Sequence, residues 1–200
     1  MRTIALLLLF AMAASPVYAD AKKAKDKVKK ANEEIDRRNL TGAEKQLREA
    51  IKEDPANIDA HSLLADILAQ TGRNSQAAVE YETVLALDDH QHKYSSVQRR
   101  KFVDQYGVST ALGGNLERAK EIYIKALAKD PDYAMYNYNL ACVYAEQGDL
   151  ASALPYLKKS WKHRDTLPDD ISYPDPRKDS SFKQYLNDPR FKEAVRDMVI

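Results

Sequence analysis

The sequence predicts an all-α protein built as a stack of about four helix-turn-helix units. The first observation is a recurring alanine: Ala43 and Ala77 are 34 positions apart, and so are Ala119 and Ala153. The step between the two pairs is 42 positions, eight more than the period. Each of these alanines is followed four residues later by Leu or Tyr. A period near 34 is typical of stacked helix pairs that bury a continuous core between them.

The second observation is that glycine and proline interrupt the periodic stretches at matching places. Gly72, Gly114 and Gly148 stand where the first helix of a unit ends, at a turn whose left-handed backbone favours glycine. Pro55 and Pro131 end second helices, because proline cannot continue a helix. These boundaries give units at about residues 24–57, 58–91, 100–133 and 134–167.

Within the units, the side chains vary as stacked helices require. The first helix of unit one has a narrow apolar stripe and many lysines, which suits a terminal repeat with a polar outer face. Arg38 stands there in place of the turn glycine. In the later units we expect Asn115 and Asp149 to cap second helices. Small residues should allow close helix packing and larger ones should fill the space between units. The small set is Ala65, Ala77, Gly107, Ala119, Ala141 and Ala153, and the larger set is Tyr81, Tyr123 and Leu157.

The eight extra residues fall in the segment Asp89–Arg99, between units two and three. Unit two has Asp89 where a terminating proline would be, so its second helix can run on. The segment can also lengthen the first helix of unit three through Tyr94 and Val97, by about 12 Å for eight residues. Two interpretations stay open, a contact with a partner and a tolerated surface insertion. His90 and its neighbours lack the further ligands of a metal site, so no metal is predicted.

Units three and four carry the most specific pattern, with Tyr106-Gly107, Gly114-Asn115-Leu116, Ala119, Tyr123 and Asp130-Pro131 in unit three. In this pattern the chain resembles the tetratricopeptide repeat family, over nearly all of residues 20–165. The resemblance implies a right-handed superhelical stack whose concave groove, lined by the first helix of each unit, holds a protein or peptide partner. The groove residues that it indicates are Asp66, Lys101, Gln105, Val108, Tyr138, Asn139 and Cys142.

Asn139 matches a position where such proteins often carry an asparagine that bonds the backbone of a bound peptide. A side-chain amide both donates and accepts, so Asn139 is equally suited to bonding the backbone of a neighbouring helix. Both interpretations are kept. Cys142 is the only cysteine, which excludes an internal disulfide. We expect it to be a small buried apolar residue rather than a reactive thiol.

After the fourth unit, residues 166–200 are expected to form a connection and a capping segment. Pro168, Pro174 and Pro176 indicate an irregular connection. The remainder resembles the short segment that closes many bacterial arrays of these repeats. The resemblance implies that five residues cover the exposed end of unit four, namely Phe182, Leu186, Phe191, Val195 and Met198.

Residues 1–19 are expected to be a secretory signal peptide. Arg2 is followed by an apolar run from Ile4 to Ala14, and Val17-Tyr18-Ala19 is similar to a cleavage site. The apolar run is shorter than the roughly 20 residues of a membrane-spanning helix. We therefore expect an exported protein, periplasmic or alternatively secreted, with no membrane span after cleavage.

Charge and motifs narrow the class of function. Removal of residues 1–19 removes Arg2 alone among the charged residues and leaves 30 basic and 30 acidic side chains. This balance argues against nucleic-acid binding, which requires an excess of basic residues. Motifs typical of phosphate binding, metalloproteases or serine hydrolases are missing from the sequence. We therefore expect a non-catalytic interaction scaffold of the cell envelope without a cofactor, monomeric or weakly dimeric. The alternative is a permanent accessory subunit of a pilus, secretion or cytochrome-maturation assembly.

Overall fold

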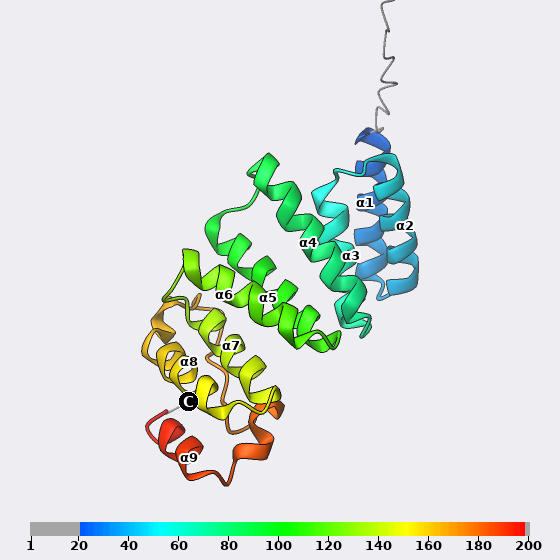
Figure 1. Cartoon of the computed structure of the whole chain (residues 1–200). Helices are drawn as coiled ribbons and strands as arrows, with labels where there is room; N and C mark the ends of the chain where they lie inside the picture. Colours follow the sequence, from blue (N-terminus) through cyan, green and yellow to red (C-terminus); the bar gives the residue numbers. More distant parts are fainter. Residues whose placement is uncertain (1–20, 199–200) are drawn as a thin grey trace, which may run out of the picture.

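A computed structural model describes residues 21–198, and in it successive helices pair and stack side by side along the chain (Figure 1). The pairs are α1 (Ala21–Asp36) with α2 (Leu40–Glu53), α3 (Ile58–Gln70) with α4 (Asn74–Gln91), α5 (Ser96–Leu112) with α6 (Leu116–Lys129), and α7 (Ala134–Glu146) with α8 (Leu150–Lys162). The predicted all-α stack is confirmed. The expected signal peptide lies outside the described residues. Among the residues that are described, every helix is too short or too polar to cross a membrane.

The turns within the units confirm the role assigned to glycine. Gly72, Gly114 and Gly148 have φ values of 74°, 90° and 85°, in the left-handed region where a side chain is strained. Arg38 takes the same conformation in unit one, with φ of 59°. The predicted caps are also confirmed. The side chain of Asn115 accepts a hydrogen bond from the Arg118 amide at 3.0 Å, and Asp149 caps α8 in the same way.

Small residues bring the helices of a unit into close contact, as predicted. Ala65, Ala119 and Ala141 are fully buried. At Gly107 of α5 the Tyr123 ring of α6 packs so closely that an added Cβ atom would overlap it. Tyr123 is itself 1% exposed and fills the space between units three and four with Tyr136, whose ring centroid lies 6.3 Å away.

The eight-residue insertion is divided between the two helices that flank it. α4 continues to Gln91, and α5 begins at Ser96 behind a capping box made by Ser95 and Gln98. Tyr94 therefore lies in the connection and not in α5, where a longer helix would have placed it. Its ring packs against Phe102 with centroids 4.6 Å apart. The neighbouring Arg99 joins the two helices through ion pairs with the last turn of α4.

The C-terminal part packs against unit four. It contains two short 3-10 helices, η1 (Arg164–Thr166) and η2 (Ser180–Tyr185), and the helix α9 (Pro189–Val195). Phe182 and Phe191 are almost fully buried, with ring centroids 5.3 Å apart, and they join a core with α7 and α8. Val195 and Met198 are buried in the same core. Leu186 was expected there too, but it lies just after η2, is 38% exposed and does not belong to this core.

Candidate functional site

The residues predicted for the groove lie on matching stripes of α3, α5 and α7. Residues spaced three or four positions apart share one face of a helix. On α5 this stripe contains Val97, Lys101, Gln105, Val108 and Leu112. The 34-residue period equates Asp104 of α5 with Tyr138 of α7, and Val108 with Cys142. The same positions on α3 are Ser62 and Asp66. The three stripes can therefore be compared position by position.

The stripe on α5 is open to solvent. Lys101 is exposed, and Gln105 and Val108 are partly exposed. At the two ends of the stripe, Val97 is 53% and Leu112 is 65% exposed. Because two polar side chains, Lys101 and Gln105, lie between apolar ones on the same helix face, this face can bury apolar surface and form hydrogen bonds with one bound segment.

The stripe on α3 is open at one end and in contact with the insertion at the other. Asp66 is exposed, and its carboxylate accepts a hydrogen bond from the Tyr81 hydroxyl at 2.6 Å. Burial together with this carboxylate raises the pKa of Tyr81. At the other end Lys93 of the insertion forms an ion pair with Asp59 at 2.5 Å. The insertion therefore neutralises one of the two acidic groups on this stripe.

Asp104 and Asn139 connect α5 to α7 between the stripes. The Asn139 side-chain amide donates a hydrogen bond to the Asp104 carboxylate. The Asp104 backbone carbonyl accepts another from the Tyr123 hydroxyl, at 3.0 Å. Burial raises the pKa of Asp104 to about 7, and the bond from Asn139 only partly offsets this. Asn139 thus bonds a side chain of the neighbouring helix, which neither interpretation of the sequence had named.

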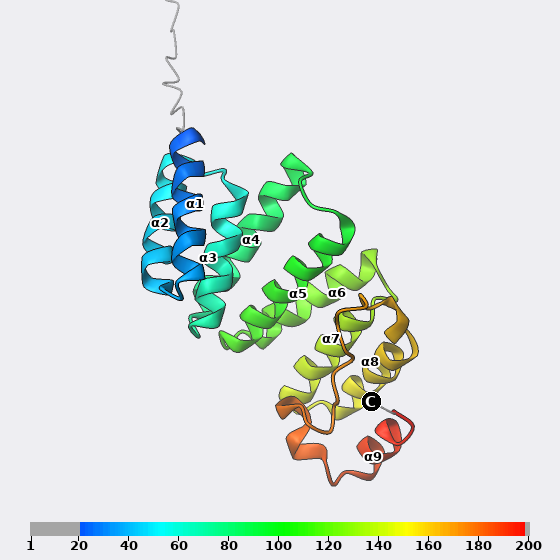
Figure 2. The ribbon, with the colours of Figure 1, turned by 180° about the vertical axis from the view of Figure 1, so that it is seen from behind.

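The stripe on α7 is covered by the chain itself. Tyr138 is only 2% exposed, and its hydroxyl donates a hydrogen bond to the Asp179 carboxylate at 2.9 Å. The rings of Tyr173 and Phe182 lie edge-on to Tyr138, with centroid distances of 5.6 and 6.3 Å. In Figure 2 the part of the chain between η1 and η2 is the orange trace that runs across α7. Tyr138 therefore does not line an open groove, contrary to the expectation from its position in the repeat.

Cys142 lies beneath the same segment. Its sulfur is 3.8 Å from the Asp179 carboxylate, and burial, reinforced by that negative charge, raises the pKa of the thiol well above its ordinary value. A thiol in this environment stays protonated and is a poor nucleophile. Cys142 is thus partly covered by the segment and, like Val108 at the equivalent position of α5, keeps part of its surface exposed. The repeat pattern does not predict that α7 is covered, because the residues that cover it lie about 40 positions further along the chain.

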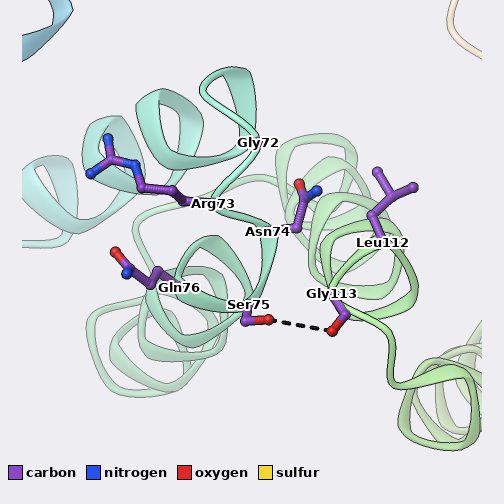
Figure 3. A pocket seen from close by; sticks show the side chains of 7 residues that line it. All are labelled: Gly72, Arg73, Asn74, Ser75, Gln76, Leu112 and Gly113. Carbon is purple, nitrogen blue, oxygen red and sulfur yellow. Dashed lines mark hydrogen bonds between the residues drawn. The ribbon is translucent and has the colours of Figure 1, made fainter.

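A shallow depression lies where the turn of unit two meets the end of α5 (Figure 3). Its volume is about 340 Å³, and Leu112 and the residues Gly72–Gln76 contribute to its wall. Ser75 donates a hydrogen bond across it to the Gly113 carbonyl at 3.4 Å. Its charged residue, Arg73, binds Glu44 of α2 through two hydrogen bonds. The depression is thus an extension of the open α5 stripe rather than a site with its own charge.

The described residues contain no group of three His, Cys, Asp or Glu side chains placed to hold a metal ion. His90 and His92 lie at the end of α4 and just after it, both exposed. The described residues thus present an open stripe on α5, a stripe on α3 that is open at one end, a covered stripe on α7, and a polar link between α5 and α7.

Two family models, each described as a tetratricopeptide repeat, match residues 34–100 and 113–160, which together are more than half of the chain. A probable UDP-N-acetylglucosamine–peptide N-acetylglucosaminyltransferase SPINDLY of Hordeum vulgare is 32% identical over 112 residues. The match covers 56% of this chain and 12% of that protein, so the chain spans a small part of its relative.

Solved structures show the same fold at low sequence identity. MamA is 18% identical, with a TM-score of 0.59, over 74% of this chain and 81% of that one. YrrB, described as having an unusual peptide-binding site, is 13% identical, with a TM-score of 0.59, over 92% and 89% of the two chains. The family models show tetratricopeptide repeats over more than half of the chain, and the solved structures show the same fold, which is in general a scaffold for protein interactions.

Proposed function

We propose that this protein is a non-catalytic scaffold that holds a peptide or helix of a partner protein along the open stripes of α3 and α5. The observation that carries the proposal is the exposed line on α5, in which Val97 and Leu112 remain 53% and 65% exposed. Single exposed apolar residues are ordinary on a protein surface, but here Val97 and Leu112 share one helix face with the partly exposed Val108, as the apolar contacts of a helix groove do.

The charges beside this line favour a particular partner. Asp66 of α3 is exposed, and Asp104 lies beside the α5 stripe without a basic partner at its carboxylate. A partner segment with apolar residues facing Val108 and Leu112, and a basic residue facing Asp66, would be complementary to the open surface. YrrB, which is described as having a peptide-binding site, supports this use of the fold by analogy.

The proposal includes a location in the cell envelope. It is supported by the apolar run of residues 4–14 and by the cleavage-like Val17-Tyr18-Ala19. Determination of the N-terminal residue of the protein from its native cells tests this location. A chain that begins near Asp20 agrees with export, and a chain that retains Met1 in the cytoplasm overturns it.

A second candidate function is a permanent subunit of a larger envelope assembly. It is favoured by two apolar side chains on second helices, Val79 of α4 at 60% exposure and Ile124 of α6 at 46%. A permanent subunit is expected to self-associate when purified alone, whereas a groove binder is expected to sediment as a monomer.

Site-specific photo-crosslinking tests the proposed function. A photoreactive residue at Lys101 on the α5 stripe is compared with one at Lys125, which is exposed on α6. In native envelope extract, Lys101 should give a discrete product that Lys125 does not. The substitution Val108→Glu in the same molecule should abolish this product, because it places a charge in the apolar part of the stripe. Identical products at both positions, or a product insensitive to Val108→Glu, would contradict the proposal.

A further inference from the structure

The C-terminal segment follows α7 from one end to the other. At the start of the helix, the Thr166 hydroxyl accepts a hydrogen bond from the Ala134 amide at 2.9 Å. At its end, the Tyr185 hydroxyl donates one to the Ala145 carbonyl at 3.1 Å. Residues 166–185 therefore run in the same direction as α7, and we call them the covering segment (Figure 2). A connection that only had to reach α9 would not need to form hydrogen bonds with the backbone at both ends of α7.

Between these ends, two side chains of the covering segment, Tyr173 and Asp179, contact α7 in addition to the buried ring of Phe182. The Tyr173 ring lies edge-on to Tyr138 of α7 and to Trp161 of α8, with centroid distances of 5.6 and 5.1 Å. Six residues later, Asp179 accepts the hydrogen bond from the Tyr138 hydroxyl at 2.9 Å. One side chain thus supplies an aromatic contact and the other a charge-assisted hydrogen bond. These are the features by which a peptide is recognised.

The covering segment matches α7 and would not match α5. The residue of α5 equivalent to Tyr138 is Asp104. A carboxylate such as Asp179 would be repelled there when Asp104 is ionised, whereas Tyr138 offers it a hydrogen-bond donor. Cys142 is small enough to lie under the same carboxylate, at 3.8 Å. The stripe on α7 is therefore specific for a segment with a carboxylate at this position.

We propose that the stripe on α7 is a binding site for an extended peptide that carries an aromatic residue and, six positions later, a carboxylate. The covering segment is its resident ligand, and a partner segment of the same chemistry replaces it. The inference rests on the proposed function only in that partners reach this side of the stack. The test of this inference needs no partner protein. The inference and the proposed function can therefore fail independently of each other.

Cys142 supplies the measurement, because it is the only thiol and lies beneath Asp179. In the full chain its reaction with a maleimide should be slow. The double variant Tyr173→Ala, Asp179→Asn should react about tenfold faster, since the covering segment leaves α7 more often. A synthetic peptide of residues 166–181 should slow the reaction of the double variant in a saturable way. A peptide with the same two substitutions should not.

Binding of the fluorescently labelled peptide gives a second readout. It should bind the double variant about tenfold more tightly than the wild type, in which the resident ligand competes. Ile171→Ala is the matched control, because this side chain belongs to the same segment and is 37% exposed. It should leave both readouts as in the wild type.

If the double variant loses its helical circular dichroism, Asp179→Asn alone serves instead. An asparagine still accepts the hydrogen bond from the Ser181 amide that starts η2, so the fold of the segment is kept. A folded variant whose Cys142 reacts faster but is not protected by the peptide would overturn the proposal. So would a wild-type Cys142 that reacts as fast as it does in the urea-unfolded chain.

Discussion

The stripes of α5 and α7 occupy equivalent positions in neighbouring units, yet one is open and the other is covered. At the equivalent positions Asp104 and Tyr138, the α5 residue is partly exposed, whereas the α7 residue is 2% exposed. The repeat itself does not create this difference, since both helices are first helices of well-formed units. It arises because residues 166–185 return along α7 and fill its surface.

The comparison teaches that a few substitutions decide which part of a regular stack receives a given segment. Asp104 on α5 corresponds to Tyr138 on α7, and Val108 corresponds to Cys142. A segment that carries Asp179 gains a hydrogen bond from the tyrosine and would be repelled by the aspartate when Asp104 is ionised. Under the proposed function, partners of the open α5 stripe would therefore differ in chemistry from the segment that covers α7.

The largest expected effect concerns the covered region. Phe182 is fully buried against Phe191 and Tyr138, so Phe182→Ala leaves a cavity and should lower the free energy of unfolding by about 3–5 kcal/mol. The matched substitution on the open stripe is Leu112→Ala, which should change it by less than about 0.5 kcal/mol. Urea unfolding followed by circular dichroism measures both. Similar losses for the two variants would show that the regions do not differ in burial as described.

A smaller effect is expected beneath the open stripe. Gly107→Ala adds a methyl group that overlaps the Tyr123 ring, so α5 and α6 must separate. Overpacking of this kind costs about 1–3 kcal/mol. Gly113→Ala is the comparison, because its methyl group would meet the Ser75 hydroxyl at 2.8 Å and backbone atoms of Ser109 and Ser75 only at 3.0 and 3.2 Å, with no ring to displace. Thermal unfolding should show the larger loss for Gly107→Ala, and the reverse order would contradict the close contact between α5 and α6.

The architecture could be predicted from the sequence because its determinants are local and repeated. Gly114 and Asn115, for example, fix a turn and a helix start within a few residues of themselves. The open residues Lys101 and Val108 follow from the same period. In each case a position in the repeat decides the environment of the side chain.

The covered stripe could not be predicted, since it depends on contacts between residues far apart in the sequence. Asp179 lies 41 positions after Tyr138, in a stretch whose prolines indicated only an irregular connection. The link from Asn139 to Asp104 spans 35 positions and joins two side chains that each look like free groove residues. The insertion was ambiguous for a different reason, because either flanking helix could absorb it and both do.

The smallest expected effect separates the two stripes by their response to pH. Burial raises the pKa of Asp104 to about 7 in the folded protein, above the value near 3.9 of an unfolded chain. Between these values the folded state binds more protons, so its free energy of unfolding decreases as pH rises from about 4 to 7. Asp104→Asn removes this pH-dependent contribution to the free energy of unfolding. At pH 8 the variant should be more stable than the wild type by on the order of 1 kcal/mol.

Urea unfolding of both proteins across this pH range measures the difference between them, in which other titrating groups cancel. The curve for Asp104→Asn should diverge from that of the wild type above pH 4, because only the wild type has this carboxylate to ionise. If the two curves run parallel, the Asp104 carboxylate is as well solvated in the folded state as in the unfolded chain. The buried polar link between α5 and α7 would then be absent, and the two stripes would differ only by the segment that covers one of them.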